Sequence, residues 1–370
     1  MADNPLHANE HRLSLAIFGI NVSGGCSMTS APDTLAINWD ETRRIALAAE
    51  AAGFDALIPV ARWKGMGGQT NFNHRSWEPF TLASALAAVT ERIAIFSTCH
   101  VPTVHPVRLA KEVATIDQIS SGRFCLNIVA GWNAPEIELF GAPQRPHDER
   151  YDVADDWINL TKRLWTEPSE FDYQGPYFTC ENAYSDPKPV QQPYPLIMSA
   201  GNSPKGLEFA ARHADLNFVV APNLEVAGEN ARDVREMAAR QPERRNKPIK
   251  VFGQGYVVCR DTEAEAIAFR DKYVNDLGDW EGVRNLLDVL IPNSQSALGD
   301  QWESMAANMI AGYGALPLVG TPDQVVEGML AFADAGLDGL TLSWVDYSAG
   351  IEQFDKVLRP RLVEAGLRSS

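Results

Sequence analysis

The sequence has few cysteines, and they form no recognisable pattern. Its 370 residues include only five, none of them in a CxxC pair: Cys26, Cys99, Cys125, Cys180 and Cys259. Wide spacing of an odd number of cysteines argues against a zinc framework and against a disulfide scaffold, and it is typical of reduced cytosolic thiols. We therefore expect a cytoplasmic protein without a structural metal.

Several functional signatures are also missing. Residues 1–12 are polar and contain no apolar signal core, and no apolar run reaches the length of a membrane span. The sequence contains no GxSxG, no P-loop and no Cys/His signature, so it gives no support for nucleophilic or phosphoryl-transfer catalysis. His100 and His105 have no third histidine or suitably spaced carboxylate around them, which argues against a metal pair.

Positive charge is scarce. The chain has 48 acidic residues against 32 lysines and arginines, and its formal net charge is −16. Such a balance argues against nucleic acid and anionic membranes as partners. An anionic ligand must therefore be held by local groups, such as a helix N-terminus or a single arginine.

What the sequence does contain is a regular alternation of apolar runs and helical patterns. Eight runs are predicted to be strands: 13–20, 54–60, 92–98, 123–130, 196–200, 216–220, 251–259 and 338–344. Such alternation without a break in composition predicts one α/β domain over residues 1–370, a (β/α)8 TIM barrel with insertions. The rival doubly wound sheet usually has a GxGxxG turn after its first strand, and residues 19–25 do not fit that spacing. A hairpin is expected near 170–180 and a lid-like insertion near 276–317.

Two places in this pattern could hold an anion. Ser203 can cap a helix whose first turn contains Pro204, and free N–H groups at such a helix start suit a phosphate. A plain cap without a ligand fits the same residues. Arg150 and Tyr151, early in another helix, could add a second contact, since the arginine fork suits phosphate. An arginine beside Asp148 and Glu149 is otherwise simply solvated.

Asn127 is the polar exception in the fourth predicted strand. A buried amide is normally kept for a defined set of hydrogen bonds, and its donor and acceptor suit the edge of a pyrimidine-like ring. Neighbouring backbone could satisfy it equally. At the end of the third predicted strand, His100 is the best candidate for a general base, because histidine titrates near neutrality; a structural histidine is the alternative.

The motifs around these residues resemble those of the bacterial luciferase-like flavin monooxygenase superfamily, within it the group of pyrimidine and dimethylsulfone monooxygenases. The resemblance covers nearly the whole chain and is dense from 54 to 218. It is carried by Arg62-Trp63-Lys64-Gly65-Met66-Gly67-Gly68, by residues 114–120, by Asn127-Ile128-Val129-Ala130-Gly131-Trp132 and by His147-Asp148-Glu149-Arg150-Tyr151.

The resemblance implies particular site residues. FMN contacts would fall at Ala61, Arg62, Asn127 and Glu136, with Arg150, Tyr151 and Ser203 on the phosphate side. The pocket in which oxygen meets reduced flavin would comprise Ile58, Thr98, Asn127 and Trp132. The substrate side, with Trp63, His74, His100, Trp344 and the lid, follows neither relative closely.

The resemblance also implies an activity. We expect an FMNH2-dependent monooxygenase that receives reduced FMN from a separate NAD(P)H:flavin reductase and forms a homodimer or homotetramer. With O2 it would cleave a C–N or C–S bond of a small organic substrate, through a flavin-N5-peroxide. The alternatives are a sulfone or alkanesulfonate monooxygenase that uses a C4a-peroxyflavin, a deazaflavin-dependent oxidoreductase, and a non-catalytic flavin-binding protein.

Overall fold

The computed structural model describes residues 4–8, 10–244 and 247–369. It divides into two compact units, which are described separately. Unit 1 comprises Met1–Ala8, Pro79–Phe218 and Asp233–Lys250, and unit 2 comprises Asn9–Glu78, Val219–Arg232 and Val251–Ser370.

Unit 1 is built on parallel strands. In its described part the strand order is β3 (Ala94–His100), β4 (Phe124–Val129), β7 (Leu196–Ser199) and β8 (Leu216–Phe218). Its other elements are α1 (Pro5–Ala8), α3 (Pro79–Val89), η1 (Val101–Thr103), α4 (Pro106–Ile119), α5 (Ala134–Leu139), α6 (His147–Thr166), α7 (Pro204–His213) and η2 (Pro242–Arg244). The strands are buried almost throughout, which explains their continuous apolar sequence.

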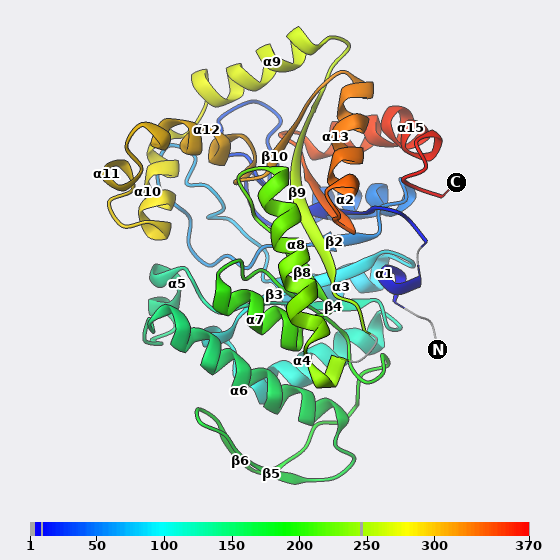
Figure 1. Cartoon of the computed structure of the whole chain (residues 1–370), viewed down its shortest axis with the longest axis vertical. Coiled ribbons are helices and arrows are strands. Elements are labelled where there is room, and N and C mark those ends of the chain that lie inside the picture. The colour runs from blue at the N-terminus through cyan, green and yellow to red at the C-terminus, as the bar shows by residue number, and fades with distance from the viewer. Residues whose placement is uncertain (1–3, 9, 245–246, 370) are drawn as a thin grey trace. The chain divides into compact units, whose positions relative to one another are not determined.

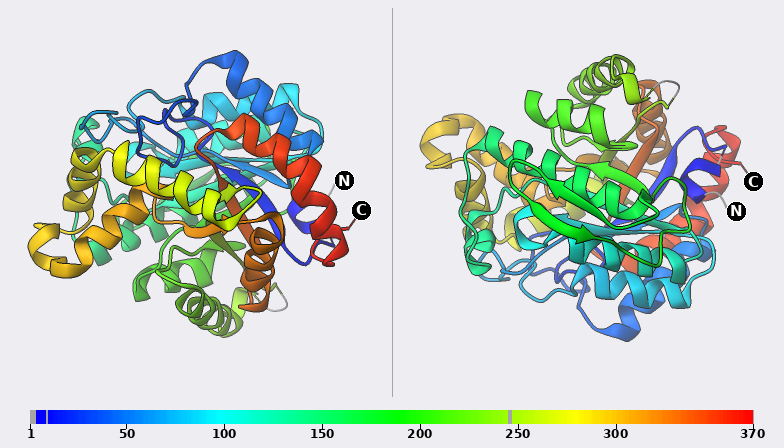
Figure 2. Two further views of the ribbon diagram at one scale, coloured as in Figure 1. Left: turned by 90° about the horizontal axis from the view of Figure 1, so that it is seen from above. Right: turned by 90° about the horizontal axis from the view of Figure 1, so that it is seen from below.

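A hairpin leaves unit 1 after α6, as predicted. β5 (Phe171–Gln174) and β6 (Thr179–Ala183) pair antiparallel and lie alongside α6 in Figures 1 and 2. Asp156 of α6 fixes the hairpin, because its carboxylate accepts hydrogen bonds from Tyr173 Oη at 2.6 Å and from the N–H groups of Tyr177 and Phe178 at 2.7 and 2.9 Å.

Unit 2 also has a parallel sheet. Its order is β2 (Ala56–Ile58), β1 (Ser14–Phe18), β11 (Gly339–Ser343), β9 (Lys250–Cys259) and β10 (Leu316–Gly320). The helices are α2 (Trp39–Ala51), α9 (Glu263–Asp271), η3 (Lys272–Asp276), α10 (Trp280–Leu290), α11 (Ser294–Leu298), η4 (Gly299–Gln301), α12 (Trp302–Gly312), α13 (Pro322–Asp334), α14 (Tyr347–Gln353), η5 (Phe354–Leu358) and α15 (Arg359–Glu364). The remaining helix, α8 (Leu224–Ala239), passes along the chain from unit 2 into unit 1.

All eight predicted strands are present, and β10 is an additional strand that the prediction missed. The segment 276–317, expected as a lid-like insertion, is largely helical, and its role as a lid stays a prediction. Asp279 begins α10 by accepting the Gly282 N–H at 2.8 Å, and its other oxygen accepts both the N–H and the hydroxyl of Thr70 at 2.7 Å. This carboxylate therefore ties the start of α10 to the glycine-rich loop after β2.

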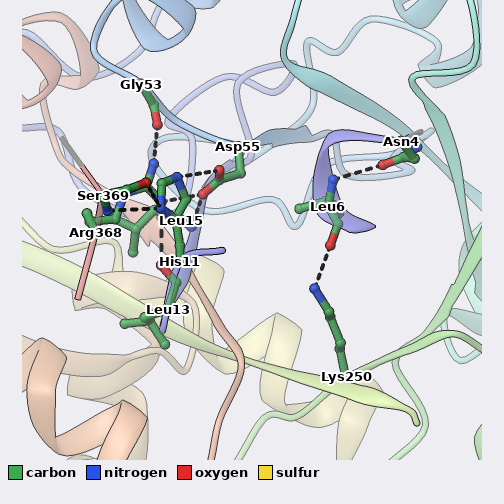
Figure 3. Close-up of polar contacts among 10 residues, drawn as sticks. All are labelled: Asn4, Leu6, His11, Leu13, Leu15, Gly53, Asp55, Lys250, Arg368 and Ser369. Carbon is green, nitrogen blue, oxygen red and sulfur yellow. Dashed lines mark hydrogen bonds and ion pairs between the residues drawn. The ribbon is translucent and has the colours of Figure 1, made fainter. Parts of the chain in front are cut away.

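A buried ion pair joins the C-terminal segment of unit 2 to the turn before β2 (Figure 3). The Arg368 guanidinium bonds the Asp55 carboxylate and the carbonyl oxygen of Gly53, and Asp55 also accepts the Leu15 N–H at 2.7 Å. His11 Nε2 lies 3.5 Å from the same carboxylate. The C-terminal segment is thus fastened to the turn before β2 and to β1. Within the described residues, no helix is both long and apolar enough to cross a membrane.

Candidate active site

Thr98 and Asn127 lie side by side at the carboxyl ends of β3 and β4. The two residues are in register, and Asn127 Nδ2 donates to Thr98 Oγ1 over 3.1 Å. The Asn127 side chain is only 5% exposed, and its Oδ1 is buried with no hydrogen-bond partner in the described part of the chain. A buried carbonyl oxygen in this condition costs free energy unless a ligand or water donates to it. The amide is therefore not satisfied by neighbouring backbone, the alternative that the sequence left open.

His100, two residues after Thr98, lies beside a buried carboxylate. Its Nδ1 is 3.9 Å from Glu136 Oε2, and the two side chains are 3% and 0% exposed. Glu136 comes from α5, a short helix that the sequence pattern did not predict. A carboxylate at this distance can orient an imidazole ring. The structure therefore brings together one residue proposed as a base and one proposed as a cofactor contact.

The starts of α6 and α7 form the second part of the site. Ser203 caps α7 by accepting the Gly206 N–H at 3.1 Å, and Pro204 follows in the first turn, as predicted. A Cβ built on Gly206 would lie 2.7 Å from Tyr151 Oη, and one on Gly201 would lie 2.8 Å from the same oxygen. Both positions need glycine so that backbone and phenol can approach closely.

Tyr151 is itself partly buried at this helix start. Burial raises the pKa of its hydroxyl, and hydrogen bonding to Ser203 opposes this rise. The phenol therefore stays protonated at neutral pH and can donate a hydrogen bond to an anion beside the free N–H groups of the first α7 turn.

Arg150 is a partly buried residue that braces the loop after β4. Its Nη1 donates to the Gly131 carbonyl oxygen over 2.7 Å, while its Nε is buried without a partner among the described residues. Gly131 has φ +100°, and a Cβ there would lie 3.0 Å from Pro102. This contact holds the turn that leads to the half-buried Trp132. The solvated arginine that the sequence allowed is not what the structure shows.

In unit 2, the candidate residues Ile58, Ala61 and Arg62 are all buried around the end of β2. Arg62 Nη2 donates to Tyr313 Oη over 2.9 Å. Tyr313 follows α12 and was not predicted from the sequence, because 251 positions separate it from Arg62 and no local pattern marks it. Arg62 is therefore held by a hydroxyl from a distant segment.

Three aromatic residues of unit 2 that were predicted to lie on the substrate side differ in how exposed they are. Trp63 is 40% exposed and His74 is exposed, whereas Trp344 is buried against Phe54 and Tyr347. The Trp344 Nε1 atom is buried without a hydrogen-bond partner in the described residues. Trp344 thus belongs to the interior of unit 2.

The donor set of unit 1 fits a flavin. A free Oδ1 on Asn127 can accept from a ring N–H, and a capped helix start with a phenol and two obligatory glycines suits a phosphate. Polar groups near the carboxyl ends of parallel strands, with helix starts beside them, are typical of active sites in parallel α/β proteins.

The chain belongs to the luciferase-like monooxygenase family, whose family model matches residues 17–339. It is therefore a monooxygenase of this family. The pyrimidine monooxygenase RutA of Acinetobacter baylyi is 31% identical over 329 residues and the match covers 87% of each chain. The FMNH2-dependent dimethylsulfone monooxygenase of Pseudomonas putida is 28% identical over 349 residues, 93% of each chain.

A solved structure shows the same fold. The crystal structure of a riboflavin lyase, determined with modified FMN and riboflavin, matches 97% of this chain and 93% of its own with a TM-score of 0.85 at 23% identity. Together with the family match, this likeness confirms the (β/α)8 barrel predicted from the alternation of strands and helices.

Proposed function

We propose that the protein is a two-component, FMNH2-dependent monooxygenase that uses O2 to cleave a C–N or C–S bond of a small organic substrate. The observation that carries the proposal is the buried Asn127 amide, whose Nδ2 is bonded to Thr98 and whose Oδ1 has no partner. The relatives named for pyrimidine and dimethylsulfone oxidation, both similar over most of the chain, support the substrate classes.

The proposal assigns a role to each candidate site residue of unit 1. Ser203, Tyr151 and Arg150 would hold the FMN phosphate side, and Asn127 and Glu136 would lie against the ring side. Thr98 fixes the orientation of the Asn127 amide, so that its free oxygen would be available to a ring N–H of the flavin. The contacts assigned to Ala61 and Arg62, and the oxygen-side roles of Ile58 and Trp132, stay predictions from the family resemblance.

Reduced flavin supplies the two electrons with which one atom of O2 becomes water while the other enters the substrate. The protein must then orient the reactants, exclude water and manage one proton. We assign the proton transfer to His100, whose Nδ1 lies 3.9 Å from Glu136 Oε2. Its deep burial keeps that proton away from bulk solvent.

The supply of reduced flavin is part of the proposal. A separate NAD(P)H:flavin reductase would deliver FMNH2, because the sequence contains no nicotinamide fingerprint. We further propose a cytoplasmic homodimer or homotetramer, as expected from the family resemblance.

The test is single-turnover oxidation of photoreduced FMN by the full-length protein. Substrates would be a panel of pyrimidines, other N-heterocycles, sulfones and alkanesulfonates, with labelled oxygen followed by mass spectrometry. Asn127→Ala and Thr98→Ala should each lower product formation about 100-fold or more, the usual loss when a preorganised hydrogen-bonding group is removed from an active site. Thr115→Ala is the matched control, since it removes an exposed hydroxyl on α4 that bonds the Lys111 carbonyl oxygen. Unchanged flavin oxidation and product formation in both site variants would refute the proposal.

A further inference from the structure

A second polar cavity lies in unit 1 at the other end of the α6–α7 pair. Its volume is about 550 Å³, and its walls come from α6, the end of α7, Tyr194, Asp215, Arg244 and Lys247. Tyr151 and Ser203 stand at the N-terminal ends of the same two helices, whereas this cavity contains Lys162 and His213 near their C-terminal ends. It is therefore distinct from the candidate flavin phosphate seat.

Arg244 is the most informative side chain in this cavity. It is 8% exposed, and its Nη1 donates to the Ala214 carbonyl oxygen. Its Nε and Nη2 are buried and have no hydrogen-bond partner among the described residues. A buried guanidinium with unused donors is costly, and an oxyanion is the group whose geometry suits its planar fork.

Lys162 is a second cation of the cavity, and its contacts with the described residues are weak. Its Nζ makes long contacts of 3.4 Å to His213, at Nδ1 and at the carbonyl oxygen, and lies 5.0 Å from the centre of the Tyr194 ring. Lys247 lines the same cavity and is exposed. Three cationic side chains thus reach one space from two segments that lie far apart in the sequence.

The carboxylates of the cavity already have partners. Asp155 Oδ1 accepts from Arg212 Nη1 and lies against His213 Nε2, both at 2.7 Å, and Asp215 Oδ2 accepts the Ile197 N–H at 3.0 Å. The lining has four lysines and arginines, Arg212 among them, against these two aspartates, which leaves a charge of +2. This positive excess stands in a chain whose net charge is −16.

We propose that this cavity binds a small phosphate-type oxyanion, with Arg244 and Lys162 as its principal contacts and Lys247 at its rim. The volume exceeds that of inorganic phosphate, so a phosphate monoester also fits the same contacts. The site is independent of the oxygenase reaction, and its existence does not depend on the identity of the substrate.

The test is isothermal titration of the full-length protein, already saturated with FMN so that the flavin seat is filled. Inorganic phosphate and glycerol 3-phosphate are the two probes, and sodium chloride at matched ionic strength is the blank. We expect saturable one-to-one binding that Arg244→Gln and Lys162→Met each weaken at least tenfold. The arm with the tighter probe shows whether the ligand is free phosphate or a monoester.

Two exposed cations serve as matched controls. Arg240→Gln removes an arginine that directly follows α8 and pairs with Glu236, and Lys356→Met removes a lysine that pairs with Glu352. Both should leave the affinity within twofold. Should Arg244→Gln fail to fold, Lys247→Gln replaces it and should weaken binding at least threefold. Absence of saturable binding, or equal losses in the control variants, would overturn the proposal without affecting the proposed oxygenase function.

Discussion

Two arginines of this protein are equally buried but differ in how many of their donor atoms form hydrogen bonds. Arg368 and Arg244 are each 8% exposed. Arg368 bonds the Asp55 carboxylate and a backbone carbonyl oxygen, so its charge is matched within the fold (Figure 3). Arg244 bonds one backbone carbonyl oxygen and keeps two donor atoms without partners in the described residues. The comparison teaches that burial alone does not assign a role to an arginine, whereas the use of its donors does.

The largest effect on the free energy of unfolding is expected at Arg368, whose charge is paired with the Asp55 carboxylate. Arg368→Met leaves the buried Asp55 carboxylate without its cation, and should lower the free energy of unfolding by about 3–5 kcal/mol. Urea unfolding followed by circular dichroism at pH 7 measures this loss. Arg361→Met is the control, since its ion pair with Asp323 is exposed and should contribute less than about 1 kcal/mol. Equal losses in the two variants would show that the Asp55–Arg368 pair does not fasten the C-terminal segment.

Lys162 tests the opposite case, a half-buried cation for which the described residues form no ion pair within 4 Å. Burial lowers the pKa of its ammonium group from the ordinary 10.5 to about 8. Below pH 8 the lysine is charged in both the folded and the unfolded chain, and the folded state bears the full cost of burying that charge. Between pH 8 and 10.5 the folded state releases its proton first, and above 10.5 the cost has disappeared.

Lys162→Met should therefore stabilise the protein by about 1–3 kcal/mol at pH 7, and the gain should shrink as the pH rises from 8 to 10.5. Urea unfolding across this range, with the exposed Lys356→Met as control, measures the difference. If the gain in stability stayed constant with pH, the difference between the lysine and methionine proteins would come from packing and not from charge burial.

The sequence predicted well those features that repeat locally. The eight strands are buried apolar runs. Ser203 and Pro204 correctly predict the start of α7, as its N-cap and its first residue. β10 escaped prediction because Pro317 interrupts a half-exposed run, a pattern that argues against a central strand. The helices of 276–317 escaped because the segment was interpreted through its polar residues, although Val283, Leu286 and Leu287 of α10 are spaced for one buried helical face.

The sequence could not predict pairings between distant segments. Neither the position of Glu136 beside His100 nor that of Tyr313 on Arg62 follows from spacing along the chain. Asn127 stood out because a single amide interrupts an apolar strand, but its free Oδ1 becomes visible only once Thr98 is placed beside it. Local patterns thus identify candidate residues, and packing decides which of their atoms remain available.

The smallest effect on stability is expected at Arg244, and it gives the sharpest form of the comparison. Arg244→Met removes one hydrogen bond to Ala214 together with a buried guanidinium whose Nε and Nη2 have no hydrogen-bond partner among the described residues, two changes of opposite sign. The free energy of unfolding in chloride should change by less than about 1 kcal/mol, in contrast to Arg368→Met. In phosphate the wild-type protein should gain stability by mass action, because only the folded chain has the cavity, and Arg244→Met should lose most of that gain. Thermal unfolding of both proteins in chloride and in phosphate at equal ionic strength measures the four values. A large loss in chloride would make Arg244 a structural residue like Arg368, since its donors would then be needed by the fold and not by a ligand.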